Sequence, residues 1–229
     1  MSASKRDTII ISLGGSLIVP DEIDVKFLKG FRNLILKRLR THRFVIITGG
    51  GKTSRKYQNA AREITKLSDT DADWLGIHTT RLNAHFVKSL FKGYAYKKVV
   101  FNPTIKLHFK EDIMIAAGWM PGCSTDYDAI LLAKNLGVKE IINLSNIDYV
   151  YDKDPKMHDD AKKIEKISWH DFKKIVGNKW DPGLNAPFDP IASMLAHKHK
   201  IKVVILNGKN LKNLDRCLVG KGFIGTEIE

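Results

Sequence analysis

The chain has 229 residues, of which 43% are hydrophobic and 28% charged, and its 38 Lys and Arg outnumber 25 Asp and Glu for a formal net charge of +13. This length can bury a substantial core, as one large domain or two small ones, and without a long apolar segment or a secretory leader we expect no membrane span. The basic residues are dispersed and do not alternate with aromatic ones, which argues against nucleic acid as the main partner and leaves a small phosphorylated ligand, with the remaining charge on a solvated surface.

Apolar runs and helix-like patterns alternate along the first part of the chain. The run TIIISL at 8–13 predicts a strand that ends in a glycine turn, and residues 24–40 carry apolar side chains at helical spacing. A second strand is expected at 44–48, followed by a helix at 53–66. A longer helix is expected at 71–92, with four side chains available to face inward: Trp74, Ile77, Leu82 and Phe86.

The alternation continues to the C-terminus. The patterns predict strands and helices in turn: strands at 97–101, 112–118, 139–145, 202–208 and 222–229, and helices at 124–137, from 168, at 190–199 and at 210–219. Residues 102–109 fit a loop or a short element. The segment 146–166 is polar and rich in turn residues, and 178–190 is a second irregular stretch. Loops of this length inside compact domains are commonly functional.

Strands interleaved with helices predict an α/β protein whose largely parallel sheet is sandwiched between helices. No internal repeat or flexible linker divides the sequence. We therefore expect a single domain, 1–229, with two lobes that meet near residue 137: an N-lobe at 1–137 and a C-lobe at 138–229.

Two glycine clusters follow directly after apolar strands. Gly14-Gly15-Ser16 follows the first strand, and Gly49-Gly50-Gly51 follows the second, with cations at helical spacing behind it: Lys52, Arg55 and Lys56. Bare backbone at a strand-to-helix turn lets an anion approach the N–H groups, and ligands of open α/β sheets bind at this edge. Neither cluster is a GxxxxGK[ST] or a GxGxxG motif, and each alone could be an ordinary turn. Together they favour a site that handles more than one phosphate.

The sequence resembles the amino acid kinase family, and within it the uridylate kinases of archaeal type. The resemblance rests on seven strings in the family's order: ISLGGSLIVP (11–20), GGGKTSRKY (49–57), DWLGIHTTRLNA (73–84), PGCSTDYDAILLA (121–133), NIDYVYDKDP (146–155), FDPIAS (188–193) and GTEIE (225–229). It implies the amino acid kinase fold, and transfer of the γ-phosphoryl group of ATP to UMP with Mg²⁺. It further implies acceptor binding and oligomer contacts in the N-lobe and ATP binding in the C-lobe.

The resemblance assigns two sets of residues to ATP. The transferring phosphates would be cradled by Gly15, Ser16, Gly51 and Arg55, and the nucleotide would be held by Ser145, Asn146, Tyr151 and Asp154. Tyr151 can stack on adenine. Besides Arg55, Lys52 and Asp189 are the catalytic candidates, Asp189 as the acidic residue that could orient Mg²⁺; no protein metal site is otherwise expected. Arg55 could instead be solvated, DKDP could be a plain Asp-stabilised turn, and Asp189 could simply begin a helix.

A third set would hold UMP. It comprises Gly50, Asp73 and the run Trp119, Met120, Pro121, Gly122, Cys123, Ser124 and Thr125. Asp73 can accept hydrogen bonds from ribose hydroxyls, whereas Ser124 or Thr125 could equally cap a helix. Arg81 and Asn83 also match the family string, but we assign them no catalytic role.

Three positions depart from the family pattern. Ser12 and Asn146 stand where many members carry lysines, which leaves the charge of the γ-phosphate to Arg55, Lys52 or another cation. Tyr149 replaces the glycine usual in the turn before Tyr151, which changes the expected shape of the ATP pocket.

Two other functions fit the same scaffold: a kinase of another small acid or phosphate, such as isopentenyl phosphate, and a non-catalytic nucleotide-binding or storage protein. For the kinase we expect a homo-oligomer built around the N-lobe, with a hexamer as one arrangement. Cys123 and Cys217 match neither a metal site nor a disulfide framework, so we expect a reducing, cytoplasmic setting.

Overall fold

The computed structural model describes residues 6–155, 157–177 and 186–229. Its strands are β1 (Asp7–Leu13), β2 (His42–Thr48), β3 (Ile113–Ala116), β4 (Glu140–Ser145), β5 (Val150–Tyr151), β6 (Lys163–Ile164), β7 (Lys166–Ile167), β8 (Lys202–Asn207) and β9 (Thr226–Ile228). Its helices are α1 (Gly15–Ile18), α2 (Val25–Arg38), α3 (Gly51–Ile64), α4 (Asp69–Leu90), α5 (Thr125–Leu136), α6 (Trp169–Val176), α7 (Pro190–His199) and α8 (Leu211–Leu218).

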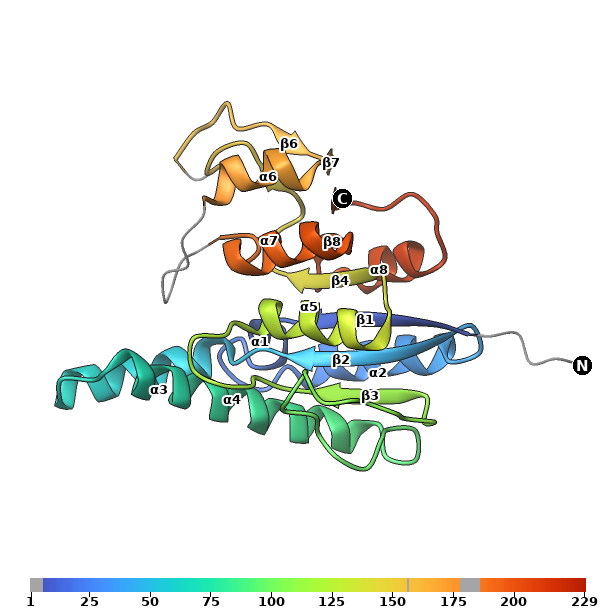
Figure 1. Ribbon diagram of the computed structural model, residues 1–229, viewed down its shortest axis with the longest axis horizontal. Helices are drawn as coiled ribbons and strands as arrows, with labels where there is room; N and C mark the ends of the chain where they lie inside the picture. The colour runs from blue at the N-terminus through green and yellow to red at the C-terminus, as the bar shows by residue number, and fades with distance from the viewer. Residues whose placement is uncertain (1–5, 156, 178–185) are drawn as a thin grey trace, which may run out of the picture.

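Seven strands form one sheet in the order β3-β2-β1-β4-β8-β9-β7, and β5 pairs with β6 in a separate two-stranded ribbon. The five strands from β3 to β8 are mutually parallel, whereas β9 runs antiparallel to β8. The prediction of an α/β fold with a largely parallel sheet is therefore confirmed. Figure 1 shows this sheet through the middle of the molecule, with helices before and behind it.

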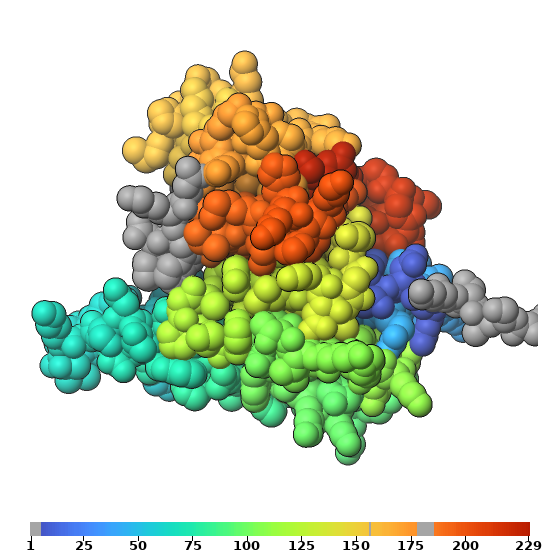
Figure 2. Space-filling view, viewed as in Figure 1, coloured from blue at the N-terminus to red at the C-terminus, as the bar shows by residue number. Residues whose placement is uncertain are grey.

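Alternate side chains of the strands pack into two separate hydrophobic cores, because successive side chains point to opposite faces of a sheet. On one face, Ile9 and Ile11 pack with side chains of α2, α4 and α8. On the other, Ile10 and Val45 pack with side chains of α5, α6 and α7. In Figure 2 the orange and red C-terminal residues lie above the green and cyan segments, which agrees with the position of β8 and β9 on the far side of β4 from β3, β2 and β1.

Three details differ from the sequence prediction. The strand predicted at 97–101 is wrong, because only Val100 makes a β-bridge there, to Ala116. Trp74 and Leu82 do not face inward: they are 38% and 66% exposed. The segment 146–166 is not a plain loop, since it contains the ribbon and reaches β7. Of the irregular stretch predicted at 178–190, residues 178–185 lie outside the described part of the chain.

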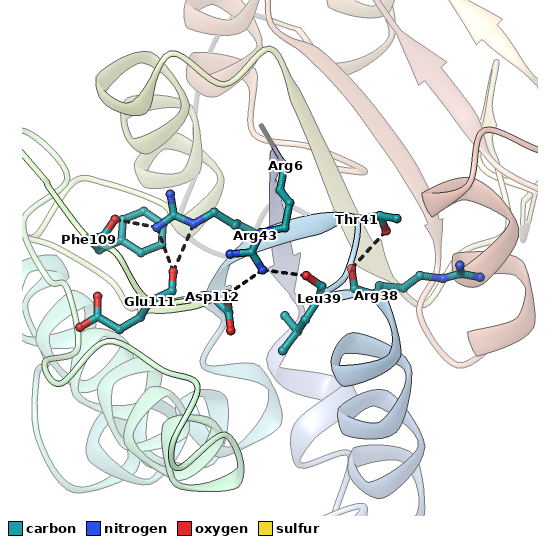
Figure 3. A network of polar contacts seen from close by, with 8 residues as sticks. All are labelled: Arg6, Arg38, Leu39, Thr41, Arg43, Phe109, Glu111 and Asp112. Atoms are coloured by element: carbon teal, nitrogen blue, oxygen red, sulfur yellow. Dashed lines mark hydrogen bonds and ion pairs between the residues drawn. The ribbon is translucent and has the colours of Figure 1, made fainter. Parts of the chain in front are cut away.

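At the amino-terminal end of the sheet, arginines tie loops to strands (Figure 3). Arg43 donates to the carbonyls of Phe109, at 2.6 Å, and Glu111, at 2.9 Å, while its guanidinium lies 4.2 Å from the centre of the Phe109 ring. Arg6 contacts Asp112 at 2.7 Å and also donates to the Leu39 carbonyl. Part of the large positive charge thus has a structural use.

None of the helices in the described ranges combines the length and hydrophobicity that a membrane span needs.

Candidate functional site

The two glycine turns touch each other at the carboxyl ends of β1 and β2. A Cβ on Gly15 would lie 2.3 Å from the Gly51 nitrogen, and a Cβ on Gly51 would lie 2.4 Å from the Gly15 carbonyl carbon. Gly51 also has a φ of +65°. No other residue fits this contact, because any side chain would overlap the facing backbone and would strain Gly51 as well.

The helices that follow these turns begin without a side-chain cap. The six other described helices each have an Asp, Ser or Asn whose side chain accepts a first-turn N–H. At α1 and α3 the N-cap residues are Gly14 and Gly50, and no side chain accepts these N–H groups. The 14-residue helix α3 therefore presents free N–H donors and its positive dipole end beside the glycine contact, which suits a phosphate.

The three cations on the first turns of α3 differ in their surroundings. Lys52 lies 3.0 Å from the Asp21 carboxylate, and that contact lowers the pKa of Asp21. Arg55 and Lys56 are exposed, with no hydrogen bond or ion pair among the described residues. Arg55 is therefore available to an anionic ligand, whereas Lys52 must first leave Asp21.

Side chains of helix α4 hold the segment 117–124 through hydrogen bonds to its backbone. Asp73 accepts a hydrogen bond from the Gly122 N–H at 2.8 Å, and Thr80 accepts one from the Gly118 N–H at 2.8 Å. Arg81 donates to the Trp119 carbonyl at 2.8 Å, and its guanidinium lies 4.5 Å from the Phe101 ring centre. The structure thus brings the predicted acceptor residues together, and it gives Arg81 a supporting role that sequence reasoning did not assign.

Two further approaches place helix α4, which holds this segment, beside the second glycine turn. Asn83 of α4 donates to the Gly49 carbonyl at 2.8 Å, and the Cβ of an alanine at Gly50 would meet the Gly76 carbonyl at 3.3 Å. Ser124 caps α5 by accepting the Tyr127 N–H at 3.1 Å, as the plainer interpretation of that residue predicted. Trp119 and Thr125 are partly buried, whereas Met120 is 43% exposed.

Two carboxylates meet where α5 and α7 begin. Asp189 caps α7 through the Ala192 N–H, so its helix-start interpretation holds, and its own N–H donates to Asp126 at 3.2 Å. Asn143 also faces Asp126, at 3.5 Å. Burial, and then the neighbouring Asp189, raise the pKa of Asp126 to about 7, although the Asp189 N–H and Ser12 act in the opposite direction. No described Lys or Arg forms an ion pair with either carboxylate.

Sequence reasoning missed Asp126. The available signal was a carboxylate in the first turn of a helix that directly follows a predicted binding run, at the sheet edge where the polar Ser12 and Asn143 interrupt apolar strands. Its partner Asp189 is 63 residues away in sequence, so only the folded chain reveals the pair.

A third carboxylate, Asp128, is fully buried beneath the acceptor segment. One of its oxygens accepts the Trp119 N–H at 3.0 Å, and the other has no partner in the described structure. Burial raises the pKa of Asp128 to about 7. The pKa of the Cys123 thiol is also raised, to about 11, by burial and by Asp128, Asp189 and Asp73. Cys123 therefore stays protonated and is no nucleophile.

Two of the four predicted nucleotide residues, Ser145 and Asn146, continue the same edge of the sheet. Gly14 donates to the Leu144 carbonyl at 3.2 Å, so the first glycine turn abuts the end of β4, where Ser145 and Asn146 follow. Tyr151 lies on β5 and is partly buried. The Asp154 carbonyl accepts two N–H groups of a turn, from Met157 and His158, which fits the turn interpretation of DKDP.

A separate cavity of about 550 Å³ lies at the opposite, amino-terminal end of the sheet. Its lining includes Glu140 and Lys202 at the beginnings of β4 and β8, together with Lys221 and Cys217. None of the predicted site residues lines it.

Comparison with known proteins gives consistent matches over nearly the whole chain. The model of the amino acid kinase family matches residues 7–207. The uridylate kinase of Thermococcus kodakarensis is 34% identical over an alignment of 224 positions, and the match covers 96% of this chain and 99% of the relative. The uridylate kinase of Thermoplasma volcanium is 34% identical over an alignment of 233 positions, and the match covers 98% of both chains.

Solved structures agree with these sequence matches. The crystal structure of a uridylate kinase from Archaeoglobus fulgidus superposes with a TM-score of 0.82 at 31% identity, over 96% of this chain and 99% of that one. A UMP kinase from Ureaplasma parvum superposes with a TM-score of 0.77 over 98% of this chain and 99% of that one, but at 20% identity it supports the fold alone.

Proposed function

Because this chain belongs to the amino acid kinase family, we propose that it is a nucleoside monophosphate kinase that transfers the γ-phosphoryl group of ATP to UMP, giving ADP and UDP. The observation that carries the proposal is the contact between the two glycine turns, beside a helix start that no side chain caps. Phosphoryl transfer needs positioning and charge stabilisation more than covalent participation by the protein, and this contact offers both.

The phosphates would bind over Gly15, Ser16 and Gly51, with Arg55 supplying a permanent charge. Backbone N–H groups lose no side-chain entropy on binding and remain aimed at the developing charge. The Arg55 guanidinium is a planar fork that can bind two phosphate oxygens at once. With Ser12 in place of a lysine, Arg55 and Lys56 are cations near the turns that no described residue neutralises, and Arg55 alone of the two carries the planar fork.

The Asp126–Asp189 pair fits Mg²⁺ as a cofactor. Mg²⁺ in kinases is held by one or two carboxylates together with substrate phosphates, rather than by a cage of protein ligands. The donor set agrees: two adjacent carboxylates have no described cationic partner, while no group of three or more His, Cys, Asp or Glu side chains in the described ranges could hold a metal ion. The ion would neutralise charge on the transferring phosphoryl group. A bound cation would lower the pKa of Asp126, which burial and the neighbouring Asp189 raise to about 7.

UMP would lie against the acceptor segment. Asp73 accepts the Gly122 N–H with one oxygen, so its carboxylate can also accept a ribose hydroxyl. Gly50 and the run 119–125 would form the remaining walls, with Arg81 and Asn83 as positioning residues behind them.

The two halves of the chain would bind different substrates. Residues 1–137 would form the lobe that binds the acceptor, and 138–229 the lobe that binds ATP through Ser145, Asn146, Tyr151 and Asp154. We expect a homo-oligomer, a hexamer being one arrangement, for which the exposed Trp74 and Leu82 on α4 offer apolar surface. A monomer mass from light scattering would refute it. Both cysteines are unpaired, which fits work in the cytoplasm.

The decisive experiment is a coupled ADP-release assay with Mg²⁺ATP and a panel of acceptors: UMP, CMP, AMP and isopentenyl phosphate. We expect ADP release that depends on UMP, with UDP identified by chromatography. Turnover with another acceptor alone, or ATP binding without turnover on any acceptor, would contradict the proposal.

A further inference from the structure

The ribbon β5–β6 has one buried face and one outer face. Val150 pairs with Ile164 across the ribbon, and both side chains pack into the second core. The next pair, Tyr151 with Lys163, must therefore point away from that core, because neighbouring residues of a strand alternate in direction. The outer face thus carries the tyrosine that the proposed function places at the ATP base, and an exposed lysine directly opposite it.

A third side chain, that of Tyr149, contacts Lys163 on the outer face. The Lys163 ammonium lies 4.9 Å from the centre of the Tyr149 ring, within the range of a cation–π contact. Glu165 lies 2.7 Å from the same ammonium and raises the pKa of Lys163, so the lysine is charged. Tyr149 precedes Tyr151 by two positions and is likewise only partly buried. Two aromatic rings and one cation are therefore gathered on the outer face.

The ribbon that carries them is fixed to the sheet. Thr226 of β9 is fully buried and accepts the Val150 N–H at 2.8 Å, while its hydroxyl donates to the Ile164 carbonyl at 2.5 Å. One residue thus holds both strands of the ribbon. At the end where the connecting loop joins the two strands, Asp152 accepts the Lys162 N–H at 2.8 Å. A site on this face would be held in place by the sheet, which lowers the entropy lost when a ligand binds.

We propose that Tyr149 and Lys163 form, with Tyr151, the binding surface for the donor base, and that this surface favours purine over pyrimidine nucleoside triphosphates. The proposal rests on the proposed function, which places Tyr151 at the base of ATP. The aromatic rings offer stacking surface, which a two-ring purine covers more fully than a one-ring pyrimidine. The Lys163 ammonium offers donors to the ring nitrogens at the edge of the base.

A glycine at position 149 would provide neither the ring nor its contact with Lys163. A tyrosine at this position adds stacking area for a base, and its ring is only partly buried in the bend before β5. The position therefore determines donor specificity in this chain, and Lys163, held by Glu165, is the cation that comes with it.

Calorimetric titration with ATP and with CTP tests the inference without any acceptor present. We expect Tyr149→Gly to weaken ATP binding about fivefold or more, and Lys163→Met to weaken it by a smaller factor, with CTP affected less than ATP in both. Tyr149→Phe, which keeps the ring, should bind ATP nearly as the parent does.

A matched control is Lys174→Met, because Lys174 also lies 2.7 Å from a carboxylate, that of Asp171, on the exposed surface of α6. It should leave the affinities for both nucleotides unchanged. Tyr149 is only partly buried in the bend before β5 and Lys163 is exposed, so both variants should nearly keep the parent's melting temperature. Parental affinities for ATP and CTP in both variants would overturn the inference.

The two proposals fail in different ways. If the parent chain binds ATP but does not phosphorylate UMP, the proposed function fails while the donor-base surface remains testable by the same titration. If the parent phosphorylates UMP and the two variants keep its ATP affinity and its preference for ATP over CTP, the proposed function stands and the donor-base surface is overturned.

Discussion

The two ends of the same sheet use charge in opposite ways. At the amino-terminal end the charged groups are paired: Arg6 with Asp112 at 2.7 Å, and Lys202 with Glu227 at 2.9 Å. At the carboxyl end, Asp126 and Asp189 lie together with no described ion pair, and Arg55 has no described partner. Paired groups hold loops and strands in place. A buried carboxylate without a cation costs stability, an exposed arginine does not, and both remain free for a ligand. The difference places the candidate site at the carboxyl end of the sheet.

The accessibility of the backbone also differs between the carboxyl and amino-terminal ends of the sheet. At the carboxyl end, strands stop in glycines whose backbones touch, so no side chain intervenes between N–H groups and an anion. At the amino end, backbone carbonyls are covered by Arg43 and Arg6. One end is built for binding and the other for stability, which predicts that substitutions at the two ends will separate activity from folding.

The largest effect is expected from Gly51→Ala. Its Cβ would lie 2.4 Å from the Gly15 carbonyl carbon at a φ of +65°, so the two turns must separate and the phosphate site must open. We expect kcat/KM to fall by about 100-fold or more, with a stability loss on the order of 2 kcal/mol. Steady-state kinetics and urea unfolding measure the two effects.

Gly93→Ala is the matched control, because Gly93 has a φ of +89° but no atom within 4 Å of the added Cβ. It should show the backbone strain alone, about 1 kcal/mol, with normal kinetics. If the two variants were alike in kcat/KM, the contact between the turns would have no role in phosphate binding.

Arg55→Ala should lower kcat by about 100-fold while leaving the melting temperature unchanged, because the side chain is exposed and makes no described contact in the free protein. The comparison is Arg62→Ala, at the far end of the same helix, whose only hydrogen bond to a described residue is to Asn59 at 3.5 Å. A near-normal rate for Arg55→Ala would remove this residue from the mechanism.

Asp73→Ala should act on the acceptor alone. Losing the hydrogen bond to Gly122 and the acceptor for a ribose hydroxyl should raise KM for UMP about tenfold, with KM for ATP unchanged. Asp69→Ala, an exposed carboxylate at the start of the same helix, should leave both constants as they are. Equal changes in the two KM values would show that Asp73 supports the fold and not the acceptor.

At the amino end, Arg43→Met should lower the free energy of unfolding by about 1–2 kcal/mol, because it leaves the carbonyls of Phe109 and Glu111 without their shared donor. The kinetic constants should not change, since the residue lies at the other end of β2. Urea unfolding and steady-state kinetics on the same preparation test this, and a fall in kcat/KM would break the contrast between the ends.

Local features of the fold were predictable from sequence because they depend on neighbouring residues. The continuous apolar runs gave β1, β2 and β4, and Ser124 and Gly137 marked the beginning and end of α5. The strand at 97–101 was wrong, since apolar residues pair only if a partner lies beside them, and only Val100 does. Trp74 and Leu82 were misplaced, because helical spacing alone does not say which apolar stripe meets the sheet.

In the candidate site, too, only the parts that depend on neighbouring residues were predictable from sequence. The glycine turns and the run 119–125 are contiguous, and they are what the family strings contain. The contacts that hold them are not contiguous: Arg81 reaches Trp119 across 38 residues, and Asp126 meets Asp189 across 63. Such pairs arise from the order of strands in the sheet, which no local pattern encodes.

The smallest expected effect comes from the buried Asp128 and has a definite sign. Its pKa is raised to about 7 in the folded chain by burial, so the folded state binds more protons than the unfolded state between the ordinary value near 4 and pH 7. Stability should therefore fall as the pH rises through this window. Asp128→Asn keeps an oxygen for the Trp119 N–H and removes the ionisation, so above pH 7 it should gain on the order of 1 kcal/mol.

Asp171→Asn gives the opposite case. The pKa of that exposed carboxylate is lowered by Lys174 and Ser168, so its contribution is present at neutral pH and is lost as the pH falls through the lowered value. Urea unfolding of both variants from pH 4 to 8 should flatten the stability profile at neutral pH for Asp128→Asn, and alter only the acidic limb for Asp171→Asn. A parental profile for Asp128→Asn would mean that water or a cation reaches the unpaired oxygen, and that the carboxyl end is less dry than its packing implies.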